Sequence, residues 1–268
     1  AEGTGIGGRI TSFDAADEPA APSIITAAQE IPAAGAQADY EDVKLPHIRK
    51  IIAKSMHESL TELAQLTHST SFDATNIMAF RKQLKKAAEN KELPNITLND
   101  ILIFAVSRVL LTHKDLNAHY LGDKIRHFKH VHMGIAVDTP RGLLVPTLFN
   151  ADQKSLREIS VEAKALATAA KEGNISPDAL TGGTFTVSNL GALGIEHFTP
   201  IINPPQTGIL GVNCITERIR TIDGQITAYP AMGLSLTYDH RAVDGAPASV
   251  FLMDLRKTLE NFSVLLIG

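Results

Sequence analysis

Hydrophobic residues recur at helical spacing in several parts of the chain. One such pattern covers residues 48–66, where Ile48, Ile51, Ile52, Met56, Leu60 and Leu63 share a face. Further helices are predicted over 77–90, 98–113 and 155–171. Asp73, Thr75 or Asn76 are candidate caps for the second helix and Thr97 for the third. A last helix over about 246–262 carries a stripe of Ala248, Phe251, Leu252, Leu255 and Leu259. The segment 98–113 is apolar on most sides, which predicts a buried helix.

Between these helices the hydrophobic period changes to two. Strands are predicted at 130–139, 142–150, 182–191, 206–215 and 233–240, with a turn at 138–142. The order is helices, strands, helix, strands, helix. This order predicts an α/β fold, a two-layer sandwich in which a large mixed sheet is covered by helices.

The first 38 residues lack such periodicity. Residues 11–38 are rich in Ala, Pro and acidic residues and predict a flexible linker, with folded sequence starting near Tyr40. Gly3 to Gly8 match G-x-G-x-x-G, but there is no room for the strand that a dinucleotide site requires before it. Because the chain begins with Ala1 rather than Met, we expect it to be a fragment of a longer protein.

Composition excludes several classes of function. The formal net charge of −4 over 268 residues gives no reason to expect a nucleic-acid partner. No apolar run approaches the ~20 residues that span a bilayer, so no membrane association is expected. The single cysteine, Cys214, cannot form an intrachain disulfide and fits a reducing compartment.

The stretch "SLTYDHRAVDGAP" (235–247) carries the first candidate chemistry. Alternation along the strand places His240 on the same face as Leu234, Leu236 and Tyr238, at the end of a buried face. Asp244 follows four residues later, just before a helix. Spacing alone leaves three interpretations open: a catalytic base, half of a metal site, or a helix cap with a core histidine.

A second histidine cluster, "HFKHVH", contains His127, His130 and His132. Histidines that share one strand face are more often solvent-exposed surface residues than ligands of a zinc ion. The pair His240 and Asp244 would also need a third ligand. We therefore expect no metal.

Four motifs occur together, in the order "GIAVDTPRGLLVP", "GGTFTVSNLG", "INPPQTGILGV" and "DHRAVDGA". In this combination residues 39–268 strongly resemble the catalytic domain of dihydrolipoamide acyltransferases, the core components of 2-oxo acid dehydrogenase complexes. That family shares its fold with chloramphenicol acetyltransferase. Residues 1–10 resemble the tail of the peripheral-subunit-binding domain that precedes the catalytic domain in this family.

The resemblance implies acyl transfer between coenzyme A and a dihydrolipoyl group carried on separate N-terminal domains. It makes His240 the base that takes the thiol proton and Ser188 the donor to the tetrahedral oxyanion. It assigns Asp244 to support of the site rather than to a relay with His240. Asn189, Arg141 and Ser69 are weaker candidates for cofactor binding.

The resemblance also implies a homotrimer in which His240 of one subunit meets Ser188 of its neighbour. In the family the C-terminal tail, here "VLLI" (264–267), docks onto a neighbouring trimer to build a cubic or dodecahedral core. Packing of this tail onto its own domain is the alternative. The implied partners are the dehydrogenase and dihydrolipoamide dehydrogenase components. The implied compartment is the bacterial cytoplasm or, as a second choice, the mitochondrial matrix.

The motifs look most like those of acetyl-transferring members, which indicates a pyruvate or acetoin dehydrogenase complex. Succinyl or branched-chain specificity, a free acetyltransferase of the chloramphenicol-acetylating kind and a non-catalytic scaffold are the alternatives. The stretch 67–73 departs from the family at His68 and Ser69, where more apolar residues are usual. Arg49 could contact a ligand or a neighbouring subunit.

Overall fold

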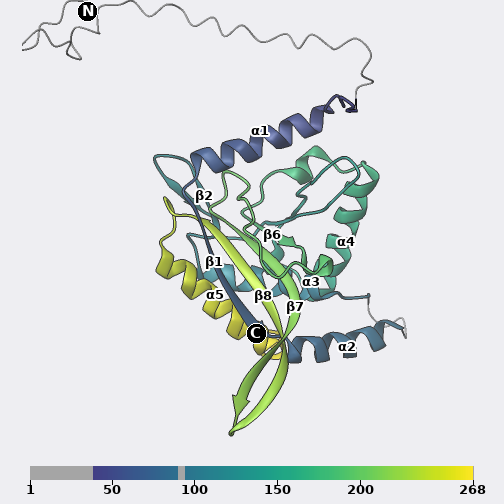
Figure 1. Cartoon of the computed structure of the whole chain (residues 1–268), viewed down its shortest axis with the longest axis vertical. Helices are drawn as coiled ribbons and strands as arrows, with labels where there is room; N and C mark the ends of the chain where they lie inside the picture. Colours follow the sequence, from purple (N-terminus) through teal and green to yellow (C-terminus); the bar gives the residue numbers. More distant parts are fainter. Residues whose placement is uncertain (1–38, 90–93, 268) are drawn as a thin grey trace, which may run out of the picture. The chain divides into compact units, whose positions relative to one another are not determined.

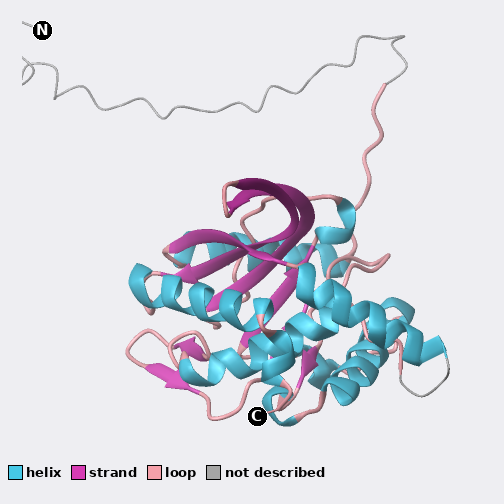
Figure 2. Ribbon diagram, turned by 90° about the horizontal axis from the view of Figure 1, so that it is seen from below, coloured by secondary structure: helices cyan, strands magenta, loops and turns pink. Residues whose placement is uncertain are grey.

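The computed structural model describes residues 39–89 and 94–267. The predicted tail 1–10, the linker 11–38 and the glycine motif lie outside the described residues. A six-stranded mixed sheet runs through the fold in the order β1-β8-β7-β6-β4-β5 (Figures 1 and 2). Its strands are β1 (Gln65–Asp73), β4 (Met133–Ile135), β5 (Thr147–Leu148), β6 (Phe185–Asn189), β7 (Gly208–Ile222) and β8 (Gln225–Asp239). A small second sheet pairs β2 (Ala118–Tyr120) with β3 (Ile125–His127).

Six α-helices complete the described part of the chain: α1 (His47–Glu62), α2 (Thr75–Glu89), α3 (Leu98–Val109), α4 (Leu156–Glu172), α5 (Gly245–Glu260) and α6 (Phe262–Leu265). Both α3 and α4 begin with capping boxes. Thr97 caps α3 with Asp100, and Ser155 caps α4 with Glu158. None of the helices among the described residues combines the length and apolarity that a bilayer crossing requires.

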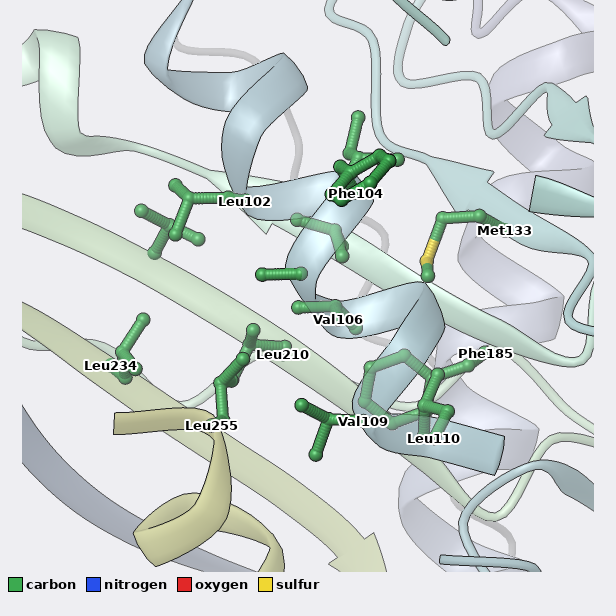
Figure 3. Close-up of a cluster of buried hydrophobic side chains, with 14 of the residues drawn as sticks. Leu102, Phe104, Val106, Val109, Leu110, Met133, Phe185, Leu210, Leu234 and Leu255 are labelled. Atoms are coloured by element: carbon green, nitrogen blue, oxygen red, sulfur yellow. The ribbon is translucent and has the colours of Figure 1, made fainter. Parts of the chain in front are cut away.

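The core forms where α3 and α5 pack onto one face of the sheet. Nine of the 12 residues of α3 are buried, which confirms the predicted buried helix. Figure 3 shows Leu102 and Val106 of α3 close to Leu210 of β7, Leu234 of β8 and Leu255 of α5. The burial of these aliphatic side chains is the main favourable contribution to folding. The predicted α/β arrangement of a mixed sheet with covering helices is confirmed.

Several boundaries differ from the prediction. The predicted strands 130–139 and 142–150 are shorter, Met133–Ile135 and Thr147–Leu148, and two further differences come from long-range pairing. The helical pattern over 48–66 ends at Glu62, and residues 65–73 form β1, paired antiparallel with β8 from Gln65 opposite Asp239 to Asp73 opposite Ala231. The predicted strands 206–215 and 233–240 are parts of a longer hairpin, since β7 and β8 each have 15 residues. Long-range pairing decides both cases, because strand formation depends on the partner more than on local propensity.

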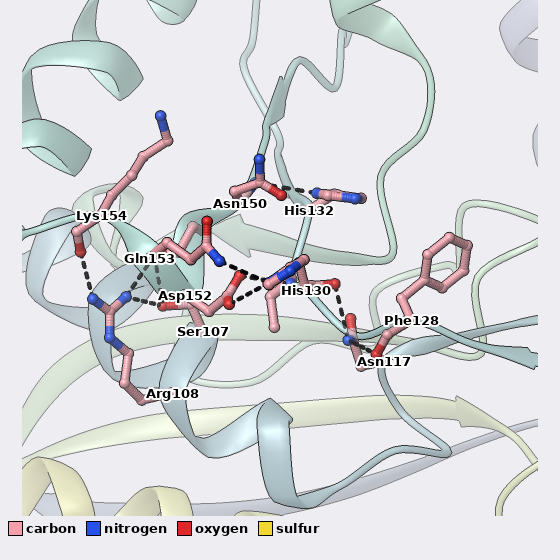
Figure 4. Close-up of polar contacts among 12 residues, drawn as sticks. Ser107, Arg108, Asn117, Phe128, His130, His132, Asn150, Asp152, Gln153 and Lys154 are labelled. Carbon is pink, nitrogen blue, oxygen red and sulfur yellow. Dashed lines mark hydrogen bonds and ion pairs between the residues drawn. The ribbon is translucent and has the colours of Figure 1, made fainter.

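The predicted histidine cluster near β3 does not converge on one point (Figure 4). His130 Nδ1 lies 3.0 Å from Asp152 Oδ2. His127 Nε2 lies 2.8 Å from a different carboxylate oxygen, Asp115 Oδ1. His132 Nδ1 instead accepts the Asn150 backbone N–H at 3.1 Å. Among the described residues no group of three or more His, Cys, Asp or Glu is placed to hold a metal ion.

Two histidines of this region make the fold sensitive to acid. Burial lowers the pKa of His119 and of His132, and the nearby Arg126 adds to the effect on His119. The unfolded chain therefore takes up these protons at a higher pH than the folded chain does. The free energy of unfolding is thus expected to fall as pH decreases below about 6.5, the ordinary pKa of histidine.

Urea unfolding at pH 7.5 and pH 5.5 measures this dependence. Replacing both His119 and His132 by Gln should reduce the loss of stability between the two pH values. The matched control is His47→Gln with His57→Gln, two exposed histidines of α1. Equal pH dependence in both double variants would contradict the assignment.

Candidate active site

His240 follows directly after β8, which ends at Asp239. Its backbone N–H donates to the Ala64 carbonyl at 2.8 Å, and its side chain is 45% exposed. The preceding strand residues are buried on both faces. The prediction that His240 ends a buried face is therefore corrected: the strand ends one residue earlier, and the imidazole lies in the turn beyond it.

A buried ion pair holds this turn. Arg241 Nε lies 3.0 Å from both carboxylate oxygens of Asp239, and Arg241 Nη2 lies 2.8 Å from Asp239 Oδ2. Asp239 is fully buried, and its Oδ1 also accepts the Ala64 N–H at 3.3 Å. These bonds with Asp239 raise the pKa of Arg241. These hydrogen bonds from the guanidinium of Arg241 and from the Ala64 N–H satisfy the buried carboxylate of Asp239. Because Asp239 and Arg241 flank His240, their ion pair also fixes the backbone on each side of it.

Asp244 contributes less to the turn than expected. Its Oδ1 lies 3.8 Å from His240 Nδ1, beyond hydrogen-bond range, and its side chain is 82% exposed. It stands at the N-cap of α5 without a side-chain capping bond. Within the chain Asp239, not Asp244, is thus the carboxylate that holds the turn. Within the described part of one chain, Ser188, His240 and Asp244 form no hydrogen-bonded relay.

Ser188 lies on β6, far from His240 of the same chain. In register, Ser188 is opposite Gly211 of β7, which is opposite Ser235 of β8. His240 lies five residues beyond Ser235 along the chain. At about 3.3 Å per residue and 4.8 Å per strand, the two side chains are separated by about 16 Å along the strands and about 10 Å across them. The order of β6, β7 and β8 in Figure 1 agrees.

A cavity of about 1180 Å³ lies beside the end of β6. Val187 and Asn189, the neighbours of Ser188, line it, and Asn189 is held by Asn99 through a 3.1 Å hydrogen bond. The helix α2 contributes three cations to the lining: Arg81, Lys82 and Lys85. Among the described residues, no acidic side chain lines the cavity. The cavity therefore favours an anionic ligand.

The three residues predicted to bind a cofactor do not lie together. Asn189 lines the cationic cavity, but Ser69 lines a separate polar cavity of about 580 Å³. There Ser69 Oγ lies 3.2 Å from His197 Nδ1. Arg141 lines neither cavity, and its guanidinium packs at Gly173, where α4 ends.

Sequence reasoning missed the α2 cations and the Asp239–Arg241 pair. Arg81, Lys82 and Lys85 stand in a helix that was predicted, and their spacing places Arg81 and Lys85 on one side of it. That spacing was an available signal for a charged face. Asp239 and Arg241 flank His240 in sequence, so the pattern Asp-His-Arg was also readable.

The C-terminal tail is largely exposed. Val264, Leu266 and Ile267 are 65%, 42% and 87% exposed, whereas Phe262 is buried in the core. Packing onto its own domain therefore does not account for these three residues. They form an apolar patch at the end of the described chain.

Comparison with known proteins shows that the chain is an acyltransferase and identifies its family. Residues 37–267 match the family model described as 2-oxoacid dehydrogenases acyltransferase (catalytic domain). The chain belongs to this family. The expected acyltransferase class is thereby confirmed.

The names of individual relatives agree with this family assignment. The chain is 38% identical to the dihydrolipoyllysine-residue acetyltransferase component of the acetoin cleaving system of Bacillus subtilis (strain 168), covering 99% of the chain and 66% of that protein. It is 35% identical to the succinyltransferase component of the 2-oxoglutarate dehydrogenase complex of Rickettsia felis, covering 100% of the chain and 66% of that protein. The chain thus spans about two thirds of the length of these relatives.

Solved structures show the same fold. The dihydrolipoamide acetyltransferase of Azotobacter vinelandii superposes with a TM-score of 0.81 at 35% identity, covering 85% of the chain and 94% of that structure. The cubic core of a pyruvate dehydrogenase multienzyme complex gives the same values.

Proposed function

We propose that the chain transfers an acetyl group between a dihydrolipoyl arm and coenzyme A, as the catalytic core of a pyruvate or acetoin dehydrogenase complex. One observation carries the assignment of residues. The Azotobacter vinelandii enzyme was studied for the catalytic roles of a serine, a histidine 52 residues later and an asparagine four residues after that. Ser188, His240 and Asp244 have the same spacing here, with an aspartate in the third position.

His240 serves as the base. A free thiol has a pKa of ~8.5, so only a few per cent of it is thiolate at neutral pH. Imidazole titrates near neutrality and can accept the thiol proton as the sulfur attacks the thioester. Among the described residues no hydrogen bond occupies the ring of His240, which leaves a nitrogen free for this proton. The same nitrogen returns the proton to the departing sulfur, so no acyl-enzyme is needed.

Ser188 supplies the oxyanion donor from a second copy of the chain. Attack on the thioester places negative charge on the former carbonyl oxygen, and a hydroxyl donor there stabilises the transition state by about 2.7–4 kcal/mol. The separation of Ser188 and His240 within one chain means that a complete site requires two copies. A homotrimer with shared sites satisfies this requirement.

The cationic cavity beside β6 fits coenzyme A. Its phosphates would lie near Arg81, Lys82 and Lys85, and Val187 and Asn189 lead from the cavity to Ser188. The charges of α2 and the position of the oxyanion donor are thus consistent with one ligand that carries phosphates at one end and a thioester at the other. The dihydrolipoyl arm, carried on separate domains, would approach His240 from another direction.

Neutralising two of these cations should weaken coenzyme A binding. The double variant Arg81→Gln with Lys85→Gln is expected to raise KM for acetyl-CoA by about thirtyfold, with kcat within about twofold, because each lost charge–phosphate contact removes about 1 kcal/mol. Steady-state assays in low and high salt measure this. The control, Lys114→Gln with Lys124→Gln, changes two exposed lysines outside the cavity. An unchanged KM in the α2 variant would contradict the proposal that coenzyme A binds in this cavity.

A direct comparison of acyl donors identifies the acyl group that the chain transfers. Several relatives at 34–35% identity are succinyltransferase components, so succinyl transfer is the second candidate. Acylation of dihydrolipoamide from acetyl-, succinyl- and isobutyryl-coenzyme A should give the highest kcat/KM with the acetyl donor. A preference for the succinyl donor would place the chain in a 2-oxoglutarate complex instead. Transfer from none of the three would refute the enzymatic proposal.

The likeness to a cubic core and the exposed tail support assembly beyond a trimer. The patch of Val264, Leu266 and Ile267 is the surface we assign to contacts between trimers. The dehydrogenase and dihydrolipoamide dehydrogenase components would then gather around this core. A bacterial cytoplasmic location follows from the same proposal.

A further inference from the structure

His68 on β1 belongs to a hydrogen-bond network that the proposed chemistry does not use. Its Nε2 lies 3.0 Å from the hydroxyl of Tyr238 on β8, and its Nδ1 lies 3.1 Å from Ser249 Oγ on α5. The rings of His68 and Tyr238 meet edge to face, with centroids 5.0 Å apart.

The protons of this network have one consistent arrangement. Ser249 Oγ donates its hydrogen to the Gly245 carbonyl at 2.9 Å, so it can only accept from His68 Nδ1. In neutral His68, Nε2 is then unprotonated and accepts the hydroxyl hydrogen of Tyr238. Burial, together with the negative charge of Asp244, raises the pKa of Tyr238, so the phenol keeps the hydrogen that it donates. With His68 neutral, each of these bonds thus has one defined direction.

This network touches both sides of the turn that carries His240. The ring of Tyr238 is fully buried, and its centroid lies 5.7 Å from that of His240 at an interplanar angle of 43°. At its other end the network reaches Gly245, the first residue of α5, immediately after the turn. His68 thus fixes the ring beside the imidazole and the helix start that follows it.

We propose that His68 is a positioning residue for His240. Neutral His68 holds the hydroxyl of Tyr238 and the start of α5 and thereby sets the orientation of the catalytic imidazole. Protonated His68 has two N–H donors, so Tyr238 must change from donor to acceptor and its hydrogen bond reverses. The proposal rests on the proposed function of His240 as the base.

The charged groups around His68 limit the possible sources of a pH effect. From β8 it faces Tyr238, and the turn beside that ring contributes His240 and Asp244. From α5, Arg256 and Lys257 line a groove of about 700 Å³ together with His68. Among these groups, the two imidazoles are the ones whose protonation the experiment follows.

The dependence of kcat on pH tests the proposal on the assembled core. Both histidines must be neutral for full activity, so the acid limb of wild-type log kcat should be steeper than one per pH unit. His68→Gln can still accept from Tyr238 and donate to Ser249 but cannot titrate. It should keep kcat at pH 8 within about threefold and show an acid slope of about one. His68→Leu should lower kcat at pH 8 about tenfold, since a displaced base loses its alignment, with KM for acetyl-CoA unchanged.

His57→Gln, an exposed histidine of α1, is the matched control and should behave as wild type. A merely structural role for His68 would lower the thermal unfolding temperature of His68→Leu and leave its kcat and pH slope at wild-type values. That result overturns the proposal. An acid slope for His68→Gln equal to that of wild type overturns it as well.

A second measurement separates this proposal from the proposed function. Histidine C2 hydrogen–deuterium exchange, read by mass spectrometry, gives the titration midpoint of each imidazole in the assembled core. A cation at position 68 opposes a second one on His240, so His68→Gln should raise the midpoint of His240. An unchanged midpoint contradicts the coupling even if the core is active. A core that transfers no acyl group refutes the proposed function, whereas a shifted midpoint still supports the coupling of the two histidines.

Discussion

His240→Ala should lower kcat for acetyl transfer by about 10²–10⁴-fold, with little change in KM for acetyl-CoA. The imidazole acts on the thiol proton in the transition state and makes no essential contact with the bound thioester. Without it, the reaction depends on the small fraction of substrate thiol that ionises unaided. The residual rate of the variant should therefore rise with pH up to about 8.5, the ordinary pKa of a thiol.

Stopped or coupled assays of dihydrolipoamide acylation between pH 6 and pH 9 measure both effects. Because His240 is exposed and its backbone is held by Ala64 and by the flanking Asp239–Arg241 pair, the variant should fold and assemble as wild type does. Light scattering checks the particle, and His57→Ala controls for the loss of an exposed histidine. A His240→Ala core with wild-type kcat would exclude this imidazole as the base.

The fold was predictable where the hydrophobic pattern is strong and local. The helix 98–113 and the stripe of Phe251, Leu252 and Leu255 are apolar at helical spacing, and both form helices that pack in the core. The strand β1 was not predicted, because its alternating residues Thr67, Ser69 and Ser71 are polar. Its identity as a strand comes from pairing with β8, some 170 residues away, which no local pattern encodes.

The sequence motifs single out candidate site residues, but they do not encode how these residues lie relative to one another. His240 and Ser188 stand in motifs that can be recognised in the sequence. Their separation, however, depends on the order and register of β6, β7 and β8. The same holds for Arg81 and Lys85, since a helix pattern gives their spacing but not the strand end beside which they lie. Asp239 was overlooked because Asp244 has the more conspicuous position before a helix.

Ser188→Ala should lower kcat by about 10²–10³-fold, and a mixture with His240→Ala should recover activity. Each variant alone lacks one half of every site. In trimers formed at random from equal amounts of the two, a site is complete where a copy with intact His240 faces a copy with intact Ser188. This arrangement occurs at about one site in four, so co-assembled cores should show about a quarter of wild-type activity.

Co-expression of differently tagged copies, followed by isolation of particles that carry both tags, provides the mixed cores. Particles of each variant mixed only after assembly are the control and should stay inactive, since intact trimers exchange no subunits on the time scale of the assay. If the two residues served a site within one chain, no mixture could restore it, because every chain would carry one defect. Recovery after co-assembly alone would thus show that Ser188 and His240 act across a subunit interface, as their separation of about 16 Å along the strands and about 10 Å across them requires.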